Sequence, residues 1–405
     1  MMRKFSLGII QPRATQFDGP LFRRIAALPD LDLTVYFNKS TTPDIFHDPE
    51  LGHTRQWDND TLSGYRKIVS RGDVISQVKL LRIMLAANHD LIVVSGYREW
   101  LYIAIALAGK LRSIPVGIRT DNVLLYQKEN SWKWRLKEAT LPWFFKLYVT
   151  GHPTGTLARQ YLRHYRFKDE ALFLFPYNVD NDYLKSISSK IFAERDKSRA
   201  NLGISPKDFV VLGILKFVPR EDPMTLLRAY ARLVKKCPDA HLILVGDGEL
   251  RGSIEQLIAQ EQLDKVHLAG FVSYSQLPRY LAISDVFVHP ATRESWGVTV
   301  NEAMACGVPV ITSDKVGSSA DLITVGETGF VFRAGDHLAL EDLLMKLRND
   351  EKLRAKLSRN GSIRINEWSY EMTCRNLLMA LQYVQAVRGT HSPQTDIHCS
   401  GEKKP

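Results

Sequence analysis

The chain has 405 residues, of which 45% are hydrophobic and 24% are charged. This is the composition of an ordinary globular protein, so it excludes wholesale disorder and fibrous repeats, and the length predicts two or three domains. The net charge of +10 is uneven: 27 Lys and Arg stand against 18 Asp and Glu in residues 1–190, but 27 against 26 in residues 191–405, which favours two domains with different partners.

Strands and helices alternate in the first half of the chain. The apolar run Phe5–Ile10 is too short for the core of a signal peptide, so we expect it to lie in the first buried strand of a cytoplasmic protein. The predicted strands are Lys4–Ile10, Leu31–Phe37, Leu91–Ser95, Pro115–Arg119, Leu147–Thr150 and Leu172–Phe175. One helix is predicted to begin at Asp18, a second to span about 74–87 and a third to end near Arg112. Two more are predicted at 131–146 and 154–165. Residues 38–64 are polar and irregular. Such alternation predicts a parallel, doubly wound sheet.

The second half repeats this alternation after a break at residues 178–182, which we interpret as the junction between domains 1–180 and 181–368. The predicted strands are Phe209–Leu215, His241–Val245, Val266–Ala269, Val286–His289, Pro309–Ser313 and Phe330–Phe332. Helices are expected at 337–349 and 351–365. A last helix, 369–388, is expected to pack back on the first domain, and the polar tail 389–405 is predicted to be disordered. The sequence therefore predicts two similar α/β domains with a cleft between them.

Membrane spans, disulfides and metal sites have no clear signal. The longest uncharged apolar run, Trp100–Gly109, has half of the ~20 residues that a spanning helix needs. The four cysteines include no C-x-x-C pair, and the 11 histidines include no H-E-x-x-H motif. We therefore expect neither a disulfide framework nor a bound metal.

The densest chemical signal lies in residues 294–310. Glu294 follows a predicted strand and so lies at the carboxyl end of the sheet, where open α/β sheets bind ligands. A helix is predicted from about Val298 to Gly307, and its first N–H groups suit a phosphate. Glu302, in the first turns of that helix, can accept two hydrogen bonds from a ribose diol. The alternative is that both glutamates are solvated surface charges.

Seven residues separate Glu294 from Glu302, and Ala-Met-Ala-Cys-Gly-Val-Pro-Val follows. In this pattern the sequence resembles the GT-B glycosyltransferases, specifically the retaining family 4 group, most clearly over residues 209–368. The resemblance implies two Rossmann-like domains that face a central cleft. It also implies that Glu302 holds the nucleotide ribose and that Glu294 is a catalytic residue beside the transferred sugar. Backbone amides at Trp296, Gly297 and Val298 would meet the sugar and the phosphate.

Two neighbouring segments match the same family in order. Gly246 follows a predicted strand in the segment Val-Gly-Asp-Gly-Glu. Arg251 stands where the dinucleotide fingerprint needs glycine, so an NAD(P) site is not expected. By resemblance, Phe271 and Val272 border the nucleotide base. The alternative is that Phe271 is a core residue at the end of a strand.

The charge of the departing diphosphate must also be balanced. The resemblance implies that protein cations do this, without a metal or another cofactor. Lys216 falls where the family usually has Arg, whereas Glu221 stands at the usual Lys position and Arg220 precedes it. We therefore expect Lys216 and Arg220 to face the diphosphate as catalytic residues and Glu221 to turn away. Otherwise these are exposed loop charges.

The acceptor and the membrane are less clearly encoded. Arg119 and Asp121 follow a predicted strand and are candidates for the cleft, although a structural role is an equal alternative. The segment Lys128–Lys168 has nine basic and two acidic residues, interleaved with aromatic residues. Basic amphipathic helices of this kind contact anionic membranes, but these aromatic residues could equally be core. No nucleic-acid motif accompanies the charge, so nucleic acid is not an expected partner.

Together these features predict a retaining hexosyltransferase-type enzyme of polysaccharide biosynthesis. It would move a sugar from a nucleotide-diphosphate sugar to a hydroxyl of a glycan or lipid-linked glycan acceptor. It would be cytoplasmic and peripheral on the inner face of the membrane. The alternatives are a non-catalytic nucleotide-sugar-binding protein of a polysaccharide assembly complex and a sugar-nucleotide epimerase on the same fold.

Overall fold

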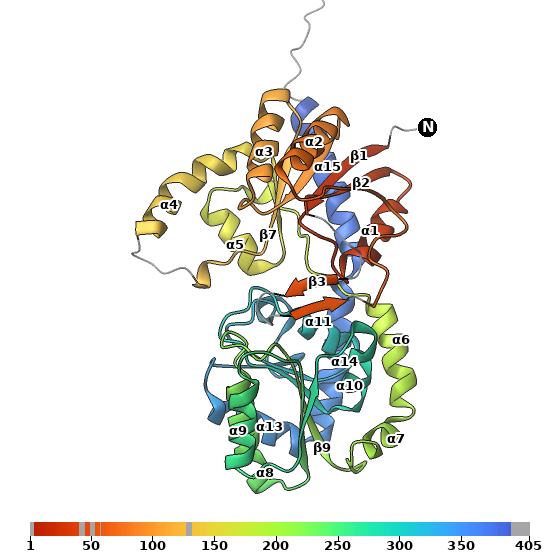
Figure 1. Ribbon diagram of the computed structural model, residues 1–405, viewed down its shortest axis with the longest axis vertical. Coiled ribbons are helices and arrows are strands. Elements are labelled where there is room, and N and C mark those ends of the chain that lie inside the picture. The colour runs from red at the N-terminus through yellow and green to blue at the C-terminus, as the bar shows by residue number, and fades with distance from the viewer. Residues whose placement is uncertain (1–3, 40–44, 49–52, 57, 127–131, 390–405) are drawn as a thin grey trace, which may run out of the picture.

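Two α/β domains lie one above the other along the long axis of the molecule (Figure 1). The computed structural model describes residues 4–39, 45–48, 53–56, 58–126 and 132–389. Each domain has a six-stranded sheet, flanked by helices, in which all paired strands are parallel. The predicted fold class, two doubly wound domains, is therefore confirmed.

The first sheet has the strand order β5-β2-β1-β6-β7-β8. Its strands are β1 (Phe5–Gln11), β2 (Leu31–Phe37), β5 (Arg66–Val69), β6 (Leu91–Ser95), β7 (Val116–Thr120) and β8 (Thr150–Pro153). The helices of this domain are α1 (Asp18–Ala26), α2 (Val74–Ala86), α3 (Trp100–Arg112), α4 (Trp132–Phe144) and α5 (Thr156–His164). Leu7, Ile9 and Ile10 of the central strand β1 are fully buried, because helices cover both faces of the sheet.

The second sheet has the equivalent order β11-β10-β9-β12-β13-β14. Its strands are β9 (Phe209–Ile214), β10 (Ala240–Val245), β11 (Val266–Gly270), β12 (Val286–His289), β13 (Val310–Ser313) and β14 (Gly329–Phe332). Its helices are α6 (Asn181–Phe192), α7 (Arg195–Ala200), α8 (Pro223–Lys236), α9 (Arg251–Gln260), α10 (Leu277–Ile283), α11 (Val298–Ala305), α12 (Ser319–Leu322), α13 (His337–Asn349) and α14 (Glu351–Glu367). Local sequence sets the starts of several helices. The Asp222 side chain, for example, accepts the Thr225 N–H at the start of α8, whose first residue is Pro223.

The chain crosses between the domains twice, and the two crossings are bonded to each other. The Asn178 amide on the first crossing donates to the carbonyls of Trp368 and Ser369 on the second, each at 3.0 Å. Helix α15 (Tyr370–Gly389) then runs along the first domain (Figure 1), where Leu377 shares a hydrophobic core with residues of β1 and β2. The end of the chain therefore helps to build the core of the first domain.

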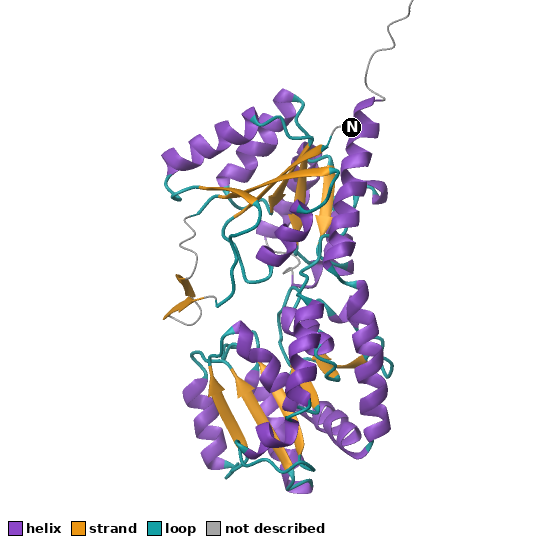
Figure 2. Cartoon of the chain, turned by 90° about the vertical axis from the view of Figure 1, so that its right-hand side faces the viewer, coloured by secondary structure: helices purple, strands orange, loops and turns teal. Residues whose placement is uncertain are grey.

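Several predicted elements of the first half are wrong. The polar segment 38–64 contains a hairpin, β3 (Ile45–Asp48) and β4 (His53–Gln56), which stands apart from both sheets (Figure 2). The strand predicted at Leu147–Thr150 is displaced to Thr150–Pro153, because residues 145–147 form a 3₁₀ turn after α4. Leu172–Phe175 is not a strand and makes only an isolated bridge. Residues 390–405 of the predicted tail lie outside the described residues.

Helix α4 exposes an apolar face. Trp132, Leu136 and Trp143 fall on one side at helical spacing and are 70%, 56% and 70% exposed. Its other side faces the protein, where Trp134 and Lys137 line a cavity described below. Within the described ranges, no helix has the length and hydropathy that crossing a bilayer requires.

Candidate functional site

A cavity of about 270 Å³ lies mainly in the second domain, at the carboxyl ends of its central strands. We call it the second-domain cavity. It is lined by the ends of β9 to β12, by the first residues of α11 and by Gln16 and Phe17 of the first domain. Of the residues that the sequence predicted for the site, eight line it: Lys216, Gly246, Phe271, Val272, Glu294, Gly297, Val298 and Glu302. Residues far apart in the sequence thus meet where parallel sheets bind ligands.

Glu302 is a buried carboxylate in the wall of this cavity. The residue is 1% exposed, and neither carboxyl oxygen has a hydrogen-bond partner among the described residues. Burial raises the pKa of Glu302 to about 8, because the charged form is desolvated. A buried carboxylate without a partner is costly, so this side chain suits a ligand that brings hydroxyl donors to it.

The start of α11 gives the cavity a second polar wall. Gly297 precedes the helix with φ +86°, and a Cβ there would lie 2.9 Å from Val316 Cγ1 and 3.3 Å from the His289 ring. This left-handed, crowded position favours glycine. The helix that follows points its free N–H groups towards the cavity edge, which is a favourable place for an anion.

Glu294 and Trp296 lie just before α11 but differ in setting. The Glu294 carboxylate lines the cavity and accepts the Trp296 backbone N–H at 3.3 Å. The Trp296 ring does not line the cavity: it is buried, its indole N–H donates to Asn301 Oδ1 at 3.0 Å, and it packs on Trp368. The Trp296 amide that was expected to meet a ligand is thus bonded to Glu294.

Residues 194–364 match the family model described as "Glycosyl transferases group 1". The matched segment includes the strands β9 to β14 and all the charged residues of the second-domain cavity.

We call residues 194–364 the group 1 glycosyltransferase domain, after the family model that they match.

Curated relatives match about half of this chain. One, from Corynebacterium glutamicum, is a GDP-mannose-dependent monoacylated alpha-(1-6)-phosphatidylinositol monomannoside mannosyltransferase, 31% identical over 197 residues, which cover 47% of this chain and 51% of that protein. Another, from Bacillus anthracis, is an N-acetyl-alpha-D-glucosaminyl L-malate synthase, 32% identical over 188 residues, which cover 46% and 47% of the two chains. The chain thus spans about half the length of the curated relatives that it matches.

Solved structures match nearly the whole chain. HepE from Anabaena, in complex with UDP, has a TM-score of 0.68 at 16% identity and covers 95% of this chain and all of its own. Sucrose-phosphate synthase from Thermosynechococcus elongatus has a TM-score of 0.67 at 21% identity, with 96% and 99% covered. The fold is GT-B, with two Rossmann-like domains.

Of the two cations that the sequence predicted for the second-domain cavity, Lys216 lines it and Arg220 does not. Lys216 lines the cavity, but so does Glu221, which was expected to turn away. The Glu221 carboxylate accepts the Lys216 backbone N–H at 2.6 Å, and this bond holds it inward. Arg220 does not line the cavity: its guanidinium bridges Glu221 and Glu294, each at 2.9 Å.

This charge cluster has a titratable member. Burial raises the pKa of Glu221 to about 7, although Arg220 beside it and the bond from Lys216 favour the charged form. Glu221 therefore changes charge near neutral pH at the edge of the second-domain cavity. Arg220 forms ion pairs with both carboxylates and does not line the cavity, whereas the sequence suggested a direct contact with the phosphate.

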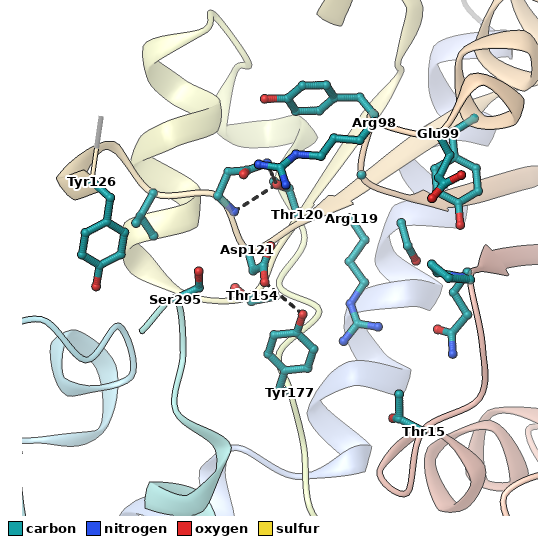
Figure 3. Close-up of a pocket in the computed structure, with 18 of the residues that line it drawn as sticks. Thr15, Arg98, Glu99, Arg119, Thr120, Asp121, Tyr126, Thr154, Tyr177 and Ser295 are labelled. Atoms are coloured by element: carbon teal, nitrogen blue, oxygen red, sulfur yellow. Dashed lines mark hydrogen bonds between the residues drawn. The ribbon is translucent and has the colours of Figure 1, made fainter. Parts of the chain in front are cut away.

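A larger cavity, of about 770 Å³, lies in the first domain and reaches the second (Figure 3). We call it the first-domain cavity. Both acceptor candidates line it. Asp121 accepts the Tyr177 hydroxyl at 3.1 Å, and Arg119 lies against the rings of Phe175 and Tyr177. Arg293 and Ser295 of the group 1 glycosyltransferase domain also line it, so the two cavities approach each other on either side of Glu294.

Sequence reasoning missed several residues of the site. His289, the last residue of β12, lines the second-domain cavity, and burial lowers its pKa to about 4, so its ring is neutral. Neither ring nitrogen has a hydrogen-bond partner within the described ranges. The sequence did offer one indication of His289, because a histidine at the carboxyl end of an apolar strand is placed where parallel sheets bind ligands. No sequence pattern indicated Tyr126 or Thr156. The Tyr126 hydroxyl donates across the cleft to the Glu294 carbonyl, and the Thr156 backbone N–H and hydroxyl donate to the Asp321 carboxylate.

Proposed function

We propose that the protein transfers a sugar from a nucleotide-diphosphate sugar to an acceptor hydroxyl, with retention of the anomeric configuration. Residues 181–368 would bind the donor and residues 1–180 the acceptor. The transferred sugar would lie beside Glu294, between the two cavities.

The observation that carries this proposal is the Glu302 carboxylate. It is buried, lacks a partner among the described residues, and faces a cavity inside a group 1 glycosyltransferase domain. A ribose diol supplies the two hydroxyl donors that this carboxylate lacks. Gly246, Phe271 and Val272 line the same cavity and leave an apolar space for the base. HepE, which is similar in fold, has been solved with UDP, with UDP and glucose, and with UDP-glucose, which is in line with such a donor.

The charge of the departing diphosphate would be met by Lys216 and by the first N–H groups of α11. Both are fixed by the fold before the substrate arrives, which is how protein dipoles and cations stabilise developing charge. Arg220 would act by neutralising Glu221 and Glu294, so that their carboxylates do not oppose the diphosphate. In this proposal the protein itself supplies these charges.

Replacement of Glu302 by alanine tests the donor site. The two hydroxyl donors of a ribose diol favour the ionised form of Glu302, and loss of these hydrogen bonds is expected to weaken nucleoside-diphosphate binding by ~1.5–3 kcal/mol, measured by calorimetry with UDP and GDP. The free energy of unfolding is expected to stay the same or rise, because an unpartnered buried carboxylate is removed. Glu255→Ala, on the exposed side of α9, is the matched control. Unchanged nucleotide affinity in folded Glu302→Ala protein would remove Glu302 from the site.

Product analysis separates the enzyme from its alternatives. A transferase is expected to release the nucleoside diphosphate with an acceptor, and slowly with water, and the new glycosidic bond is expected to keep the donor's configuration by NMR. An epimerase would return an isomeric nucleotide sugar without release. Binding of nucleotide sugars with neither release nor isomerisation would favour the non-catalytic protein.

We also propose that α4 lies on the inner face of a membrane that contains anionic lipid. Its exposed side carries Trp132, Leu136 and Trp143, and Arg135 is exposed beside them. Lys146 stands 3.8 Å from the centre of the Trp143 ring. Apolar and aromatic side chains next to cations match the boundary between lipid tails and acidic headgroups. An acceptor held in the membrane would then enter the first-domain cavity along the opposite side of the same helix.

Flotation with liposomes tests this contact. The wild type is expected to float with vesicles that contain anionic lipid, and less so as salt rises. The double variant Trp132→Ser/Trp143→Ser is expected to lose most of this binding, because both exposed rings are gone. Leu338→Ser, an exposed apolar residue of α13 in the second domain, is the control and is expected to float like wild type. Absence of wild-type binding at low salt would leave a soluble acceptor as the better proposal.

A further inference from the structure

Cations outnumber carboxylates in the lining of the first-domain cavity, and the two kinds of group differ in whether the protein already bonds to them. Its cations are Arg13, Arg98, Arg119, Lys137 and Arg293, and its carboxylates are Asp18, Glu99 and Asp121. Each carboxylate is already engaged by the protein: Asp18 by Gln11 and Thr15, Glu99 by Lys39, and Asp121 by Tyr177. The five cations have no ion pair within the described ranges. With five cations against three carboxylates, the lining carries an excess of two positive charges.

Arg119 carries the strongest part of this imbalance. The residue is 8% exposed, and its guanidinium carbon stands 4.1 Å from the centre of the Phe175 ring and 5.0 Å from that of Tyr177. One of its five N–H donors makes a hydrogen bond, at 3.4 Å, to the Pro176 carbonyl. In Figure 3 the guanidinium projects into the cavity between Tyr177 and Thr15. A buried cation with free donors is costly unless a ligand supplies an anion.

Lys137 and Arg98 place further charge at the same cavity. Lys137 is half-buried against the Tyr161 ring, and burial together with the nearby Arg98 lowers the pKa of its ammonium. Like charges brought together in this way repel, and an anion between them removes the repulsion. The guanidinium of Arg119 offers a flat pair of donors, whereas Lys137 offers a point charge, and the two together match the oxygens of a phosphate.

We infer that the acceptor carries a phosphate group, which binds in the first-domain cavity on Arg119 with help from Arg98 and Lys137. This inference rests on the proposed function, because it names the class of acceptor for that site. With its phosphate on Arg119, the acceptor has Arg293 and Ser295 along the same cavity, and its hydroxyl can approach Glu294, which lies between them in the sequence and lines the second-domain cavity. A single phosphate dianion balances more of the excess charge than a carboxylate does.

A binding experiment tests the inference without any need for turnover. The donor site is first filled with UDP or GDP, so that added phosphate cannot occupy it. Calorimetry then compares glucose 6-phosphate with glucose, and dihexanoyl phosphatidic acid with dihexanoylglycerol, below micelle concentrations. The wild type is expected to bind one phosphorylated probe at least tenfold more tightly than its uncharged partner. Which pair shows the preference distinguishes a soluble sugar phosphate from a phospholipid.

Arg119→Gln is expected to remove this preference, and Arg112→Gln, an exposed arginine of the same domain, is expected to keep it. If Arg119→Gln does not fold, the variant Arg98→Gln/Lys137→Gln serves, and it is expected to lower phosphate affinity several-fold. Equal binding of charged and uncharged probes by the wild type, or an unchanged preference in a folded variant, overturns the inference. Binding of UDP or GDP is measured in a separate titration, before the phosphorylated probes are added. Failure of the wild type to bind these nucleotides would count against the proposed function and not against the inference about the acceptor.

Discussion

Lys216→Ala is expected to reduce turnover by about 100-fold or more, as the loss of one group that stabilises transition-state charge does in other enzymes. Lys216 lines the second-domain cavity at the end of β9, where the diphosphate of a donor would lie. Its charge is more effective there than in water, because the cavity is partly closed and the effective dielectric is low. Steady-state rates with saturating donor measure the effect, and Lys190→Ala, on the exposed side of α6, is the control.

Arg220→Ala is expected to cause a loss of similar size for a different reason. Without the guanidinium, Glu294 loses its ion-pair partner beside the diphosphate, and Glu221 is uncompensated whenever it is ionised. Arg220→Lys is expected to recover part of the activity, because one charge returns without the fork that holds both carboxylates. Full activity in folded Arg220→Ala and Lys216→Ala proteins would contradict the assignment of these charges.

Glu221→Gln completes this set of variants. The pKa of Glu221 is raised to about 7, so its carboxyl is neutral below that pH and becomes negative as pH rises through it. Ionisation opposes a bound diphosphate, so wild-type donor affinity is expected to fall as pH rises from 6 to 8. The glutamine keeps the acceptor for the Lys216 N–H but cannot ionise, so it should retain activity and flatten this dependence. An equal pH dependence in both proteins would place the titrating group elsewhere.

Gly246→Ala is expected to destabilise the second domain by more than ~3 kcal/mol, the range of backbone strain combined with overpacking. Gly246 has φ +142°, and a Cβ there would stand 1.8 Å from the Leu215 carbonyl oxygen. Both the torsion and the clash involve backbone, so no side chain can yield. Loss of nucleotide binding is expected with it, because Gly246 lines the cavity.

Chemical denaturation measures this effect. Gly252→Ala is the matched control, because Gly252 lies in α9 and nothing stands within 4 Å of its added Cβ. That change is expected to raise stability by ~0.5–1 kcal/mol, as alanine is the better helix former. Equal stabilities of the two variants would show that the Leu215 loop can move aside.

Much of the fold was predictable because most strands are buried on both faces. Every residue of β9 and β12 is buried, so these strands appear in the sequence as continuous, largely apolar runs that are easy to recognise. Edge strand β5 begins with Arg66 and Lys67, which are exposed, so it has no such pattern. The hairpin of β3 and β4 pairs only with itself and lacks the apolar run that marks a sheet strand.

The candidate site divides in the same way. Glu294 and Glu302 belong to one short motif whose local structure places them together. The inward position of Glu221 depends on the bond from the Lys216 backbone N–H and on the ion pair with Arg220, and no residue pattern predicts either contact. The first-domain cavity is formed by loops and helices that are distant in sequence, from Gln11 to Ser295, so its charge imbalance emerges only after folding.

The return of α15 to the first domain bears on how the protein is made. The core that contains Leu7 and Phe22 also contains Leu377 and Leu381, so it includes residues from both ends of the chain. During synthesis these strands leave the ribosome long before their last packing partner is translated. The second domain, by contrast, is one continuous stretch and can fold first. We therefore expect ribosome-bound chains that have emerged from the exit tunnel as far as about residue 368 to hold a protease-resistant second domain beside a first domain that is still open to digestion.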